Sequence, residues 1–109
     1  MKTIAKKIKL KPNSLGLVED WSKELNARKE EVLATLIDET VVFESAFLDK
    51  ISDDEAYLIY IMVIEDVEQC RKAVQVSTHS IDAYHKEFKQ KTSDGVKSLK
   101  TLISFSTKF

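Results

Sequence analysis

The hydrophobic positions of this chain change their period along its length, and each period predicts a different element. Residues 3–10 alternate between apolar and polar side chains, which is typical of a β-strand with one buried face. Residues 40–48 and 56–64 are rich in β-branched and aromatic residues and predict two more strands, joined as a hairpin by the turn-forming residues 49–55. Residues 99–107 alternate again and predict a fourth strand.

Apolar residues three and four positions apart predict the helices. Residues 15–38 indicate one long amphipathic helix. A second helix starts at Asp66, which forms a capping-box pattern with Gln69, is interrupted at residues 77–80, and continues as a short helix until Ser-Asp-Gly at residues 93–95. The positions expected to face inward are Leu15, Val18, Trp21, Leu25, Val32, Leu33 and Leu36 in the first helix and Val67, Cys70, Ala73 and Val74 in the second.

This order, β-α-β-β-α-β, predicts an α+β fold of ferredoxin-like type, with a four-stranded antiparallel sheet and the helices on one face. The strand at residues 56–64 is apolar on both parities, and the strand before it nearly so. An antiparallel sheet with one wet face would alternate apolar and polar residues cleanly. We therefore expect a homodimer in which two sheets pack face to face and cover the second apolar surface.

Composition narrows the possible partners and location. Seventeen basic and eighteen acidic residues give a net charge of -1, without the basic excess of a nucleic-acid-binding surface. The longest stretch without charge, residues 56–64, is much shorter than the about twenty residues of a membrane-spanning helix. Lysines interrupt residues 1–9 too often for the apolar core of a signal peptide, and Cys70 is the only cysteine. We expect one cytoplasmic domain over residues 1–109, with neither nucleic acid nor membrane as a partner.

Three stretches resemble a known group of proteins: residues 8–12 followed by the helix that contains Trp21, the strand at residues 57–60, and the segment at residues 77–85. With the elements in this order, the chain resembles the dimeric α/β-barrel superfamily of ferredoxin-like proteins, which includes antibiotic-biosynthesis-type monooxygenases and sugar mutarotases. It looks closest to an uncharacterised bacterial family, a domain of unknown function. The resemblance implies the fold, the dimer and a pocket between sheet and helices, and it carries no reaction over to this chain.

The densest group of chemically capable side chains lies around the break in the second helix: His79, Asp82, Tyr84 and His85. An imidazole titrates near neutral pH, and a neighbouring carboxylate can fix its tautomer. The structural alternative is that Thr78 or Ser80 caps a helix whose positive end suits Asp82. His79 and His85 are six residues apart and so lie on different helical faces, which argues against a metal site.

Glu44 and Tyr60 form a second candidate pair, because each shares a parity with apolar strand residues and can point a polar tip into an apolar cavity. The alternatives are a Tyr60 hydroxyl bonded to the backbone and a Glu44 that protects a sheet edge. Trp21 lies at the mouth of such a pocket or in the core. The sequence therefore predicts a homodimer that binds a small molecule without a cofactor or metal. Two alternatives remain open, a cofactor-free monooxygenase- or isomerase-like enzyme and a non-catalytic interaction dimer.

Overall fold

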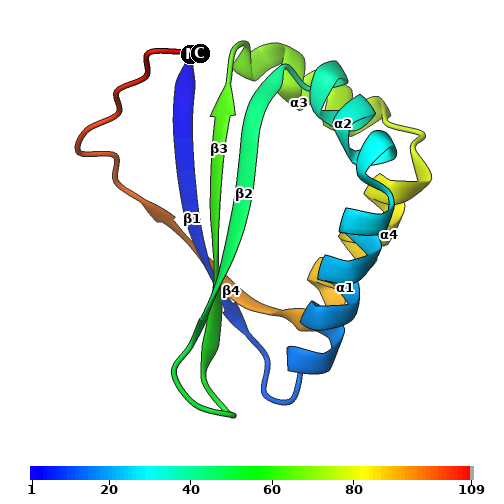
Figure 1. Ribbon diagram of the computed structural model, residues 1–109, viewed down its shortest axis with the longest axis vertical. Coiled ribbons are helices and arrows are strands. Elements are labelled where there is room, and N and C mark those ends of the chain that lie inside the picture. Colours follow the sequence, from blue (N-terminus) through cyan, green and yellow to red (C-terminus); the bar gives the residue numbers. More distant parts are fainter. Residues whose placement is uncertain (109) are drawn as a thin grey trace.

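A computed structural model describes residues 1–108 of the chain as a sheet with helices packed on one of its faces (Figure 1). The elements, in chain order, are β1 (Lys2–Leu10), α1 (Leu15–Ala27), α2 (Lys29–Asp38), β2 (Val41–Lys50), β3 (Ala56–Ile64), α3 (Val67–Val76), α4 (Ser80–Thr92) and β4 (Ser93–Leu99). Within the described residues, none of the helices combines the length and hydropathy that a transmembrane span requires.

The four strands form one antiparallel sheet in the order β2-β3-β1-β4. β2 and β4 are therefore the edge strands, and the two apolar segments of the sequence, β2 and β3, are neighbours. Ile8 in β1 pairs with Leu58 in β3 on one side and with Val96 in β4 on the other. The expected α+β class, with a four-stranded antiparallel sheet and the helices on one face, is confirmed (Figure 1).

The core lies between the sheet and the pair α1 and α4. Leu10 is almost fully buried, at 2% exposed, and Trp21 from α1 stacks on Phe88 from α4 with ring centroids 4.6 Å apart and planes 7° from parallel. Leu58 and Tyr60 of β3 close this cluster from the sheet side. Trp21 is thus a core residue, as one of its two sequence interpretations held.

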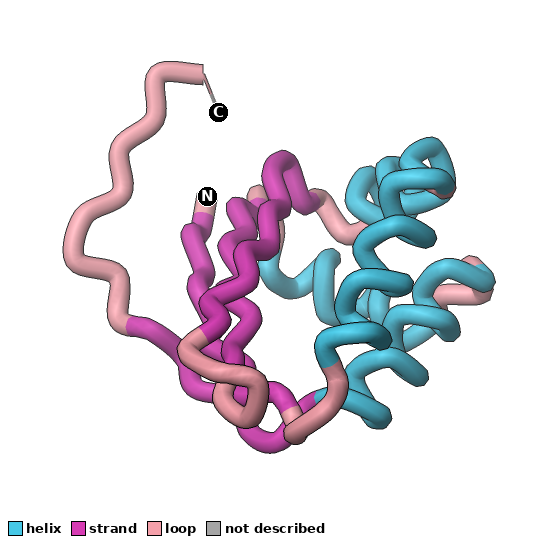
Figure 2. Tube along the Cα trace, turned by 60° about the horizontal axis from the view of Figure 1, so that its bottom comes forward, coloured by secondary structure: helices cyan, strands magenta, loops and turns pink. Residues whose placement is uncertain are grey.

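β3 presents apolar side chains to both sides of the sheet. Leu58 and Tyr60 belong to the buried cluster, whereas Ile59 and Ile61 occupy the opposite parity and face away from the helices. In β2, Phe47 pairs with Ile59 across this outer face and is 55% exposed. Among the described residues, no helix lies over this outer face, as a second view of the chain makes clear (Figure 2).

The long helix expected over residues 15–38 is two helices, which corrects the sequence prediction. Arg28 separates them with φ -110° and ψ 36°, outside the helical region, and its guanidinium pairs with Glu24 and Glu31. One straight helix over this stretch would be about 36 Å long, longer than the about 30 Å of strands with nine or ten residues. The break keeps both halves close to the sheet.

Two of the positions that were expected to face inward do not. Leu33 in α2 and Val74 in α3 are exposed. α2 and α3 lie at one end of the helical layer (Figure 1), and α3 packs mainly against α2. The Leu33 and Val74 sides of these helices face solvent.

The predicted strand over residues 99–107 is wrong. β4 is Ser93–Leu99, so it includes the Ser-Asp-Gly sequence that was expected to be a turn. Gly95, with φ +123°, lies where the pairing of β1 and β4 shifts register between Ile8 and Leu10, a conformation that glycine adopts without a Cβ penalty. After Leu99 the chain leaves the sheet on the side away from the helices (Figure 1).

We predict that Leu10→Ala lowers the free energy of unfolding by about 2–5 kcal/mol, the range for truncating a fully buried leucine. Urea denaturation followed by far-UV circular dichroism measures the change. Leu33→Ala is the matched control, because the exposed Leu33 side chain on α2 should cost less than about 1 kcal/mol. Equal losses for the two variants would contradict the position of the core.

Candidate functional site

The candidate site centres on Tyr60, whose side chain points from β3 toward the helices. Tyr60 is only 9% exposed, and its hydroxyl is buried without a hydrogen-bond partner among residues 1–108. Burial, and then the nearby charge of Glu44, raise the pKa of this phenol far above its usual range, so it stays protonated. The sequence alternative in which the hydroxyl bonds to the backbone is wrong. A buried hydroxyl without a partner is rare and costs roughly 1–3 kcal/mol.

His85 on α4 lies beside Tyr60, with ring centroids 6.1 Å apart in an edge-on arrangement. The indole N–H of Trp21 donates a hydrogen bond to Nδ1 of His85 at 3.0 Å. Burial, and then the positive charge of Lys89, lower the pKa of His85 to about 4. His85 is therefore neutral near pH 7, and because its Nδ1 accepts a bond, its proton sits on Nε2.

Glu44 on β2 supplies the carboxylate next to this pair. β2 and β3 pair Glu44 with Met62 and Ala46 with Tyr60, so Glu44 and Tyr60 are diagonal neighbours on the helix-covered face. Burial is the main cause that raises the pKa of Glu44, followed by the negative charge of Asp82. Tyr60 from β3 thus lies beside His85 from α4 and diagonal to Glu44 from β2, on the helix-covered side of the sheet.

Glu39, at the end of α2, adds a second perturbed carboxylate to this region. Its pKa is raised to about 7, first by burial and then by the negative charges of Asp82, Glu44 and Asp38. Sequence reasoning did not single out Glu39, and it also missed Lys89, one helical turn after His85. The four-residue spacing from His85 could have revealed Lys89, because side chains four apart are neighbours on a helix. No sequence pattern points to Glu39, which only the fold brings near Glu44.

His79 is separated from His85 and takes part in a different contact. Its Nε2 lies 2.9 Å from Oδ2 of Asp38, and this hydrogen bond is the main cause that raises the pKa of His79. His79 is the N-cap residue of α4 and makes no side-chain cap hydrogen bond, so neither Thr78 nor Ser80 caps this helix. Asp82 lies in the first turn of α4, as the structural alternative expected, and accepts a hydrogen bond from the Ser77 hydroxyl. His79 also lines a hollow of about 260 Å³ among α2, α3 and the segment before α4.

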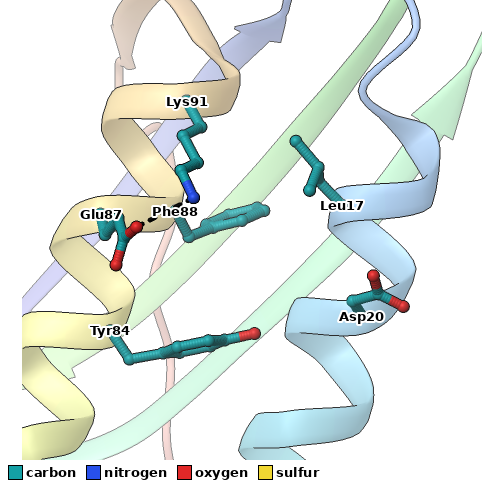
Figure 3. Close-up of a pocket in the computed structure, with 6 residues that line it drawn as sticks. All are labelled: Leu17, Asp20, Tyr84, Glu87, Phe88 and Lys91. Carbon is teal, nitrogen blue, oxygen red and sulfur yellow. Dashed lines mark ion pairs between the residues drawn. The ribbon is translucent and has the colours of Figure 1, made fainter.

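Tyr84 faces a different space from Tyr60. It lines a groove of about 200 Å³ between α1 and α4, together with Phe88 and Leu17 (Figure 3). Both aromatic rings extend from α4 toward α1, and an ion pair between Glu87 and Lys91 lies along the rim (Figure 3). Of the seven candidate residues, the fold groups Trp21, His85 and Glu44 around Tyr60 and directs His79 and Tyr84 elsewhere. The seventh, Asp82, is near enough for its charge to act on both histidines and on Glu44.

Tyr60, His85 and Glu44 together have the chemistry to bind a polar group of a small molecule. His85 Nε2–H can donate, the Tyr60 hydroxyl can donate or accept, and the Glu44 carboxylate can accept. Within residues 1–108, no set of three or more His, Cys, Asp or Glu side chains is placed to hold a metal ion. Cys70 is half-buried, and burial raises the pKa of its thiol, which makes it a weak nucleophile.

One protein family matches almost the whole chain. The sequence model of the family of unknown function DUF6176 fits residues 1–107. The chain belongs to the DUF6176 family. No curated protein and no solved structure is significantly similar to it. The DUF6176 assignment supports the part of the sequence-based resemblance that pointed to a domain of unknown function, and it names no reaction.

We predict that Glu39 makes the protein more stable as the pH falls. Its pKa is about 7 in the folded chain and about 4.3 when unfolded, so between these values the folded state binds more protons and stability rises toward acid. His85, with its lowered pKa, acts in the opposite direction below about pH 6.5.

The Glu39→Gln variant isolates the carboxylate, because His85 contributes equally to both proteins. Urea unfolding at pH 8 should show the variant more stable than wild type by about 1 kcal/mol, a value reduced because Glu39 is only half-buried. At pH 4.5 this advantage should vanish. A constant difference across this pH range would show that Glu39 ionises normally.

Proposed function

We propose that the protein is a homodimer that binds a small molecule between its sheet and its helices, with Tyr60, His85 and Glu44 as the recognition groups. The observation that carries the proposal is the buried Tyr60 hydroxyl without a hydrogen-bond partner within residues 1–108. A fold does not keep such a group without compensation, and a ligand that bonds to it supplies that compensation.

The hydrogen bond from Trp21 orients His85 for binding a ligand. It occupies Nδ1, holds the ring against Tyr60 and leaves Nε2–H as a donor of fixed direction. A neutral donor, a phenol and a carboxylate surrounded by aromatic rings suit a small, largely apolar molecule that carries one hydroxyl, amide or amine group. Such a ligand accepts from His85 and donates to Glu44 or Tyr60.

The second part of the proposal is the dimer, in which the two outer sheet faces pack together as in a dimeric α/β barrel. Its support is the apolar surface made by Phe47, Ile59 and Ile61 on β2 and β3. β1 adds a polar margin, where the ammonium of Lys7 lies 4.3 Å from the Tyr57 ring centroid. An apolar centre with a polar rim is the usual make-up of a protein interface. The strand order β2-β3-β1-β4 fits the ferredoxin-like arrangement of that superfamily.

A cytoplasmic location completes the proposal. Cys70, the only cysteine, has no partner within the chain for a disulfide, which suits a reducing compartment.

For the ligand, we predict that Tyr60→Phe abolishes binding while leaving the free protein as stable as wild type or up to about 1 kcal/mol more stable, because it removes a hydroxyl with no partner. A thermal-shift screen of one-ring fragments that carry amide, alcohol or amine groups should raise the Tm of wild type and not of the variant.

Tyr57→Phe is the matched control. Its hydroxyl donates to Glu55 on the outer side of β3, away from the site, so this variant should keep every fragment that wild type binds. The proposal fails if no fragment stabilises wild type, or if Tyr60→Phe retains the same fragments with the same shifts.

For the dimer, we predict a sedimentation-equilibrium mass of twice the 12.5 kDa of one chain at micromolar concentration. Phe47→Lys places a charge in the outer face and should weaken the dimer by at least tenfold in Kd while preserving the far-UV spectrum, since Phe47 is exposed in one chain. Leu33→Lys on the helical side is the control that should stay dimeric. A wild-type monomer at this concentration would refute the dimer.

A further inference from the structure

Carboxylates from separate parts of the chain gather beside the Tyr60 site. Glu39 caps the end of α2, Glu44 lies on β2, and Asp82 lies in the first turn of α4; all three are half-buried. Burial is the main cause that raises the pKa of Glu39 and of Glu44, and the negative charge of Asp82 is the next cause for both. We call Glu39, Glu44 and Asp82 the acidic group, because their charges act on one another.

The chain compensates the acidic group poorly. Neither Glu39 nor Glu44 forms an ion pair or a side-chain hydrogen bond within residues 1–108. Asp82 accepts a hydrogen bond from the Ser77 hydroxyl, which is neutral. Half-buried carboxylates that repel one another cost free energy unless a positive charge comes near them.

The positive side chains nearby are too few to supply that charge. Among residues 1–108, Lys89 is the only cation whose charge lowers the pKa of Glu44, and its effect is smaller than those of burial and Asp82. His79 is bonded to Asp38, a further carboxylate, and it is the smallest of the causes that act on the pKa of Glu39. Negative charge therefore remains in excess on this side of the site.

The Tyr60 hydroxyl is a second, independent sign that something binds here. The side chain is 9% exposed, and its hydroxyl has no hydrogen-bond partner within residues 1–108. After burial, the charge of Glu44 is the cause that raises the pKa of this phenol, so the hydroxyl lies on the side of the acidic group. Tyr60 and Glu44 do not bond each other, and a group that donates hydrogen bonds to both oxygens satisfies both. An ammonium group has three such donors and no acceptor.

The surroundings of Tyr60 suit the apolar body of such a ligand. The rings of Trp21 and His85 both lie with their centroids 6.1 Å from that of Tyr60. In an apolar environment of this kind, the attraction between opposite charges is stronger than in water. A neutral ligand leaves the repulsion within the acidic group unchanged and an anion adds to it, whereas a cation removes it.

We propose that the ligand is a small organic cation, a protonated amine on an apolar body, whose ammonium group is held by the Glu44 carboxylate and the Tyr60 hydroxyl. This inference rests on the proposed small-molecule site and selects the amine from the polar groups that the site can bind. Glu44 is the counter-ion, and Glu39 and Asp82 add negative charge around it. The Nε2–H of His85 is left for an acceptor elsewhere on the same molecule.

A matched pair of one-ring probes tests the charge of the ligand. Benzylamine and benzyl alcohol share a ring and a methylene group, and at pH 8 only benzylamine is positively charged. Isothermal titration calorimetry on wild type should give a Kd for benzylamine at least tenfold lower than that for benzyl alcohol. Equal affinities, or stabilisation by neutral fragments alone, overturn the cation and leave the proposed site standing. If no fragment of any charge binds, the site and the cation are both overturned.

Glu44→Gln locates the bound amine. This variant should weaken benzylamine at least tenfold and change the Kd of benzyl alcohol less than twofold, because it removes charge and keeps the shape of the side chain. Glu19→Gln is the matched control, since it removes an exposed carboxylate that pairs with Lys23 on α1, and it should bind benzylamine as wild type does.

Asp82→Asn provides a second variant in case Glu44→Gln does not fold. Its amide oxygen can still accept from Ser77, so the change removes a neighbouring charge and keeps the local hydrogen bond. Benzylamine should bind it severalfold more weakly than wild type. Wild-type affinity for benzylamine in every folded variant at Glu44 and Asp82 would show that the amine binds elsewhere and would overturn the inference.

Discussion

The central strand β3 carries apolar side chains on both of its faces, and this requirement to be covered twice governs the rest of the molecule. The helix pair α1 and α4 covers one face, where Trp21 and Phe88 stack over Leu58 and Tyr60. The other face, with Ile59 and Ile61, has no such layer within the described residues. At about 25 cal/mol per Å² of apolar area, leaving it wet forgoes several kcal/mol, a large part of the stability of a small domain.

The same packing creates the candidate site. Trp21 is buried because it fills the core, yet its indole N–H needs an acceptor, and His85 supplies it at 3.0 Å. That bond orients His85 beside Tyr60, while burial keeps the imidazole neutral. The Tyr60 hydroxyl is left without a partner within residues 1–108. Trp21 packs in the core and also orients His85, one of the groups that we assign to ligand recognition. Glu44 lies diagonal to Tyr60 on the neighbouring strand β2.

The sequence predicted those features that depend on neighbouring residues and missed those that depend on distant ones. Alternation and three- or four-residue spacing located β1, β2, β3 and the helical stretches, because each pattern reports on one element. The break at Arg28 depends on the length of the sheet beneath the helix, which no local pattern contains. Alternation predicted a strand at the end of the chain, but the pairing of β4 with β1 ends at Leu99, and residues 100–108 form no strand.

The candidate site divides in the same way. Tyr60 and Glu44 were recognisable because a polar tip stood on an apolar parity, and the fold places them on adjacent strands. His79 and His85 looked like one cluster in the sequence, but the turn before α4 sends His79 to Asp38 and His85 to Trp21. The measurement that tests the central requirement most directly is an isotope-filtered NMR experiment on a mixture of labelled and unlabelled chains. The account predicts intermolecular contacts from the methyl groups of Ile59 and Ile61, and a spectrum in which these methyls contact only water and their own chain would contradict it.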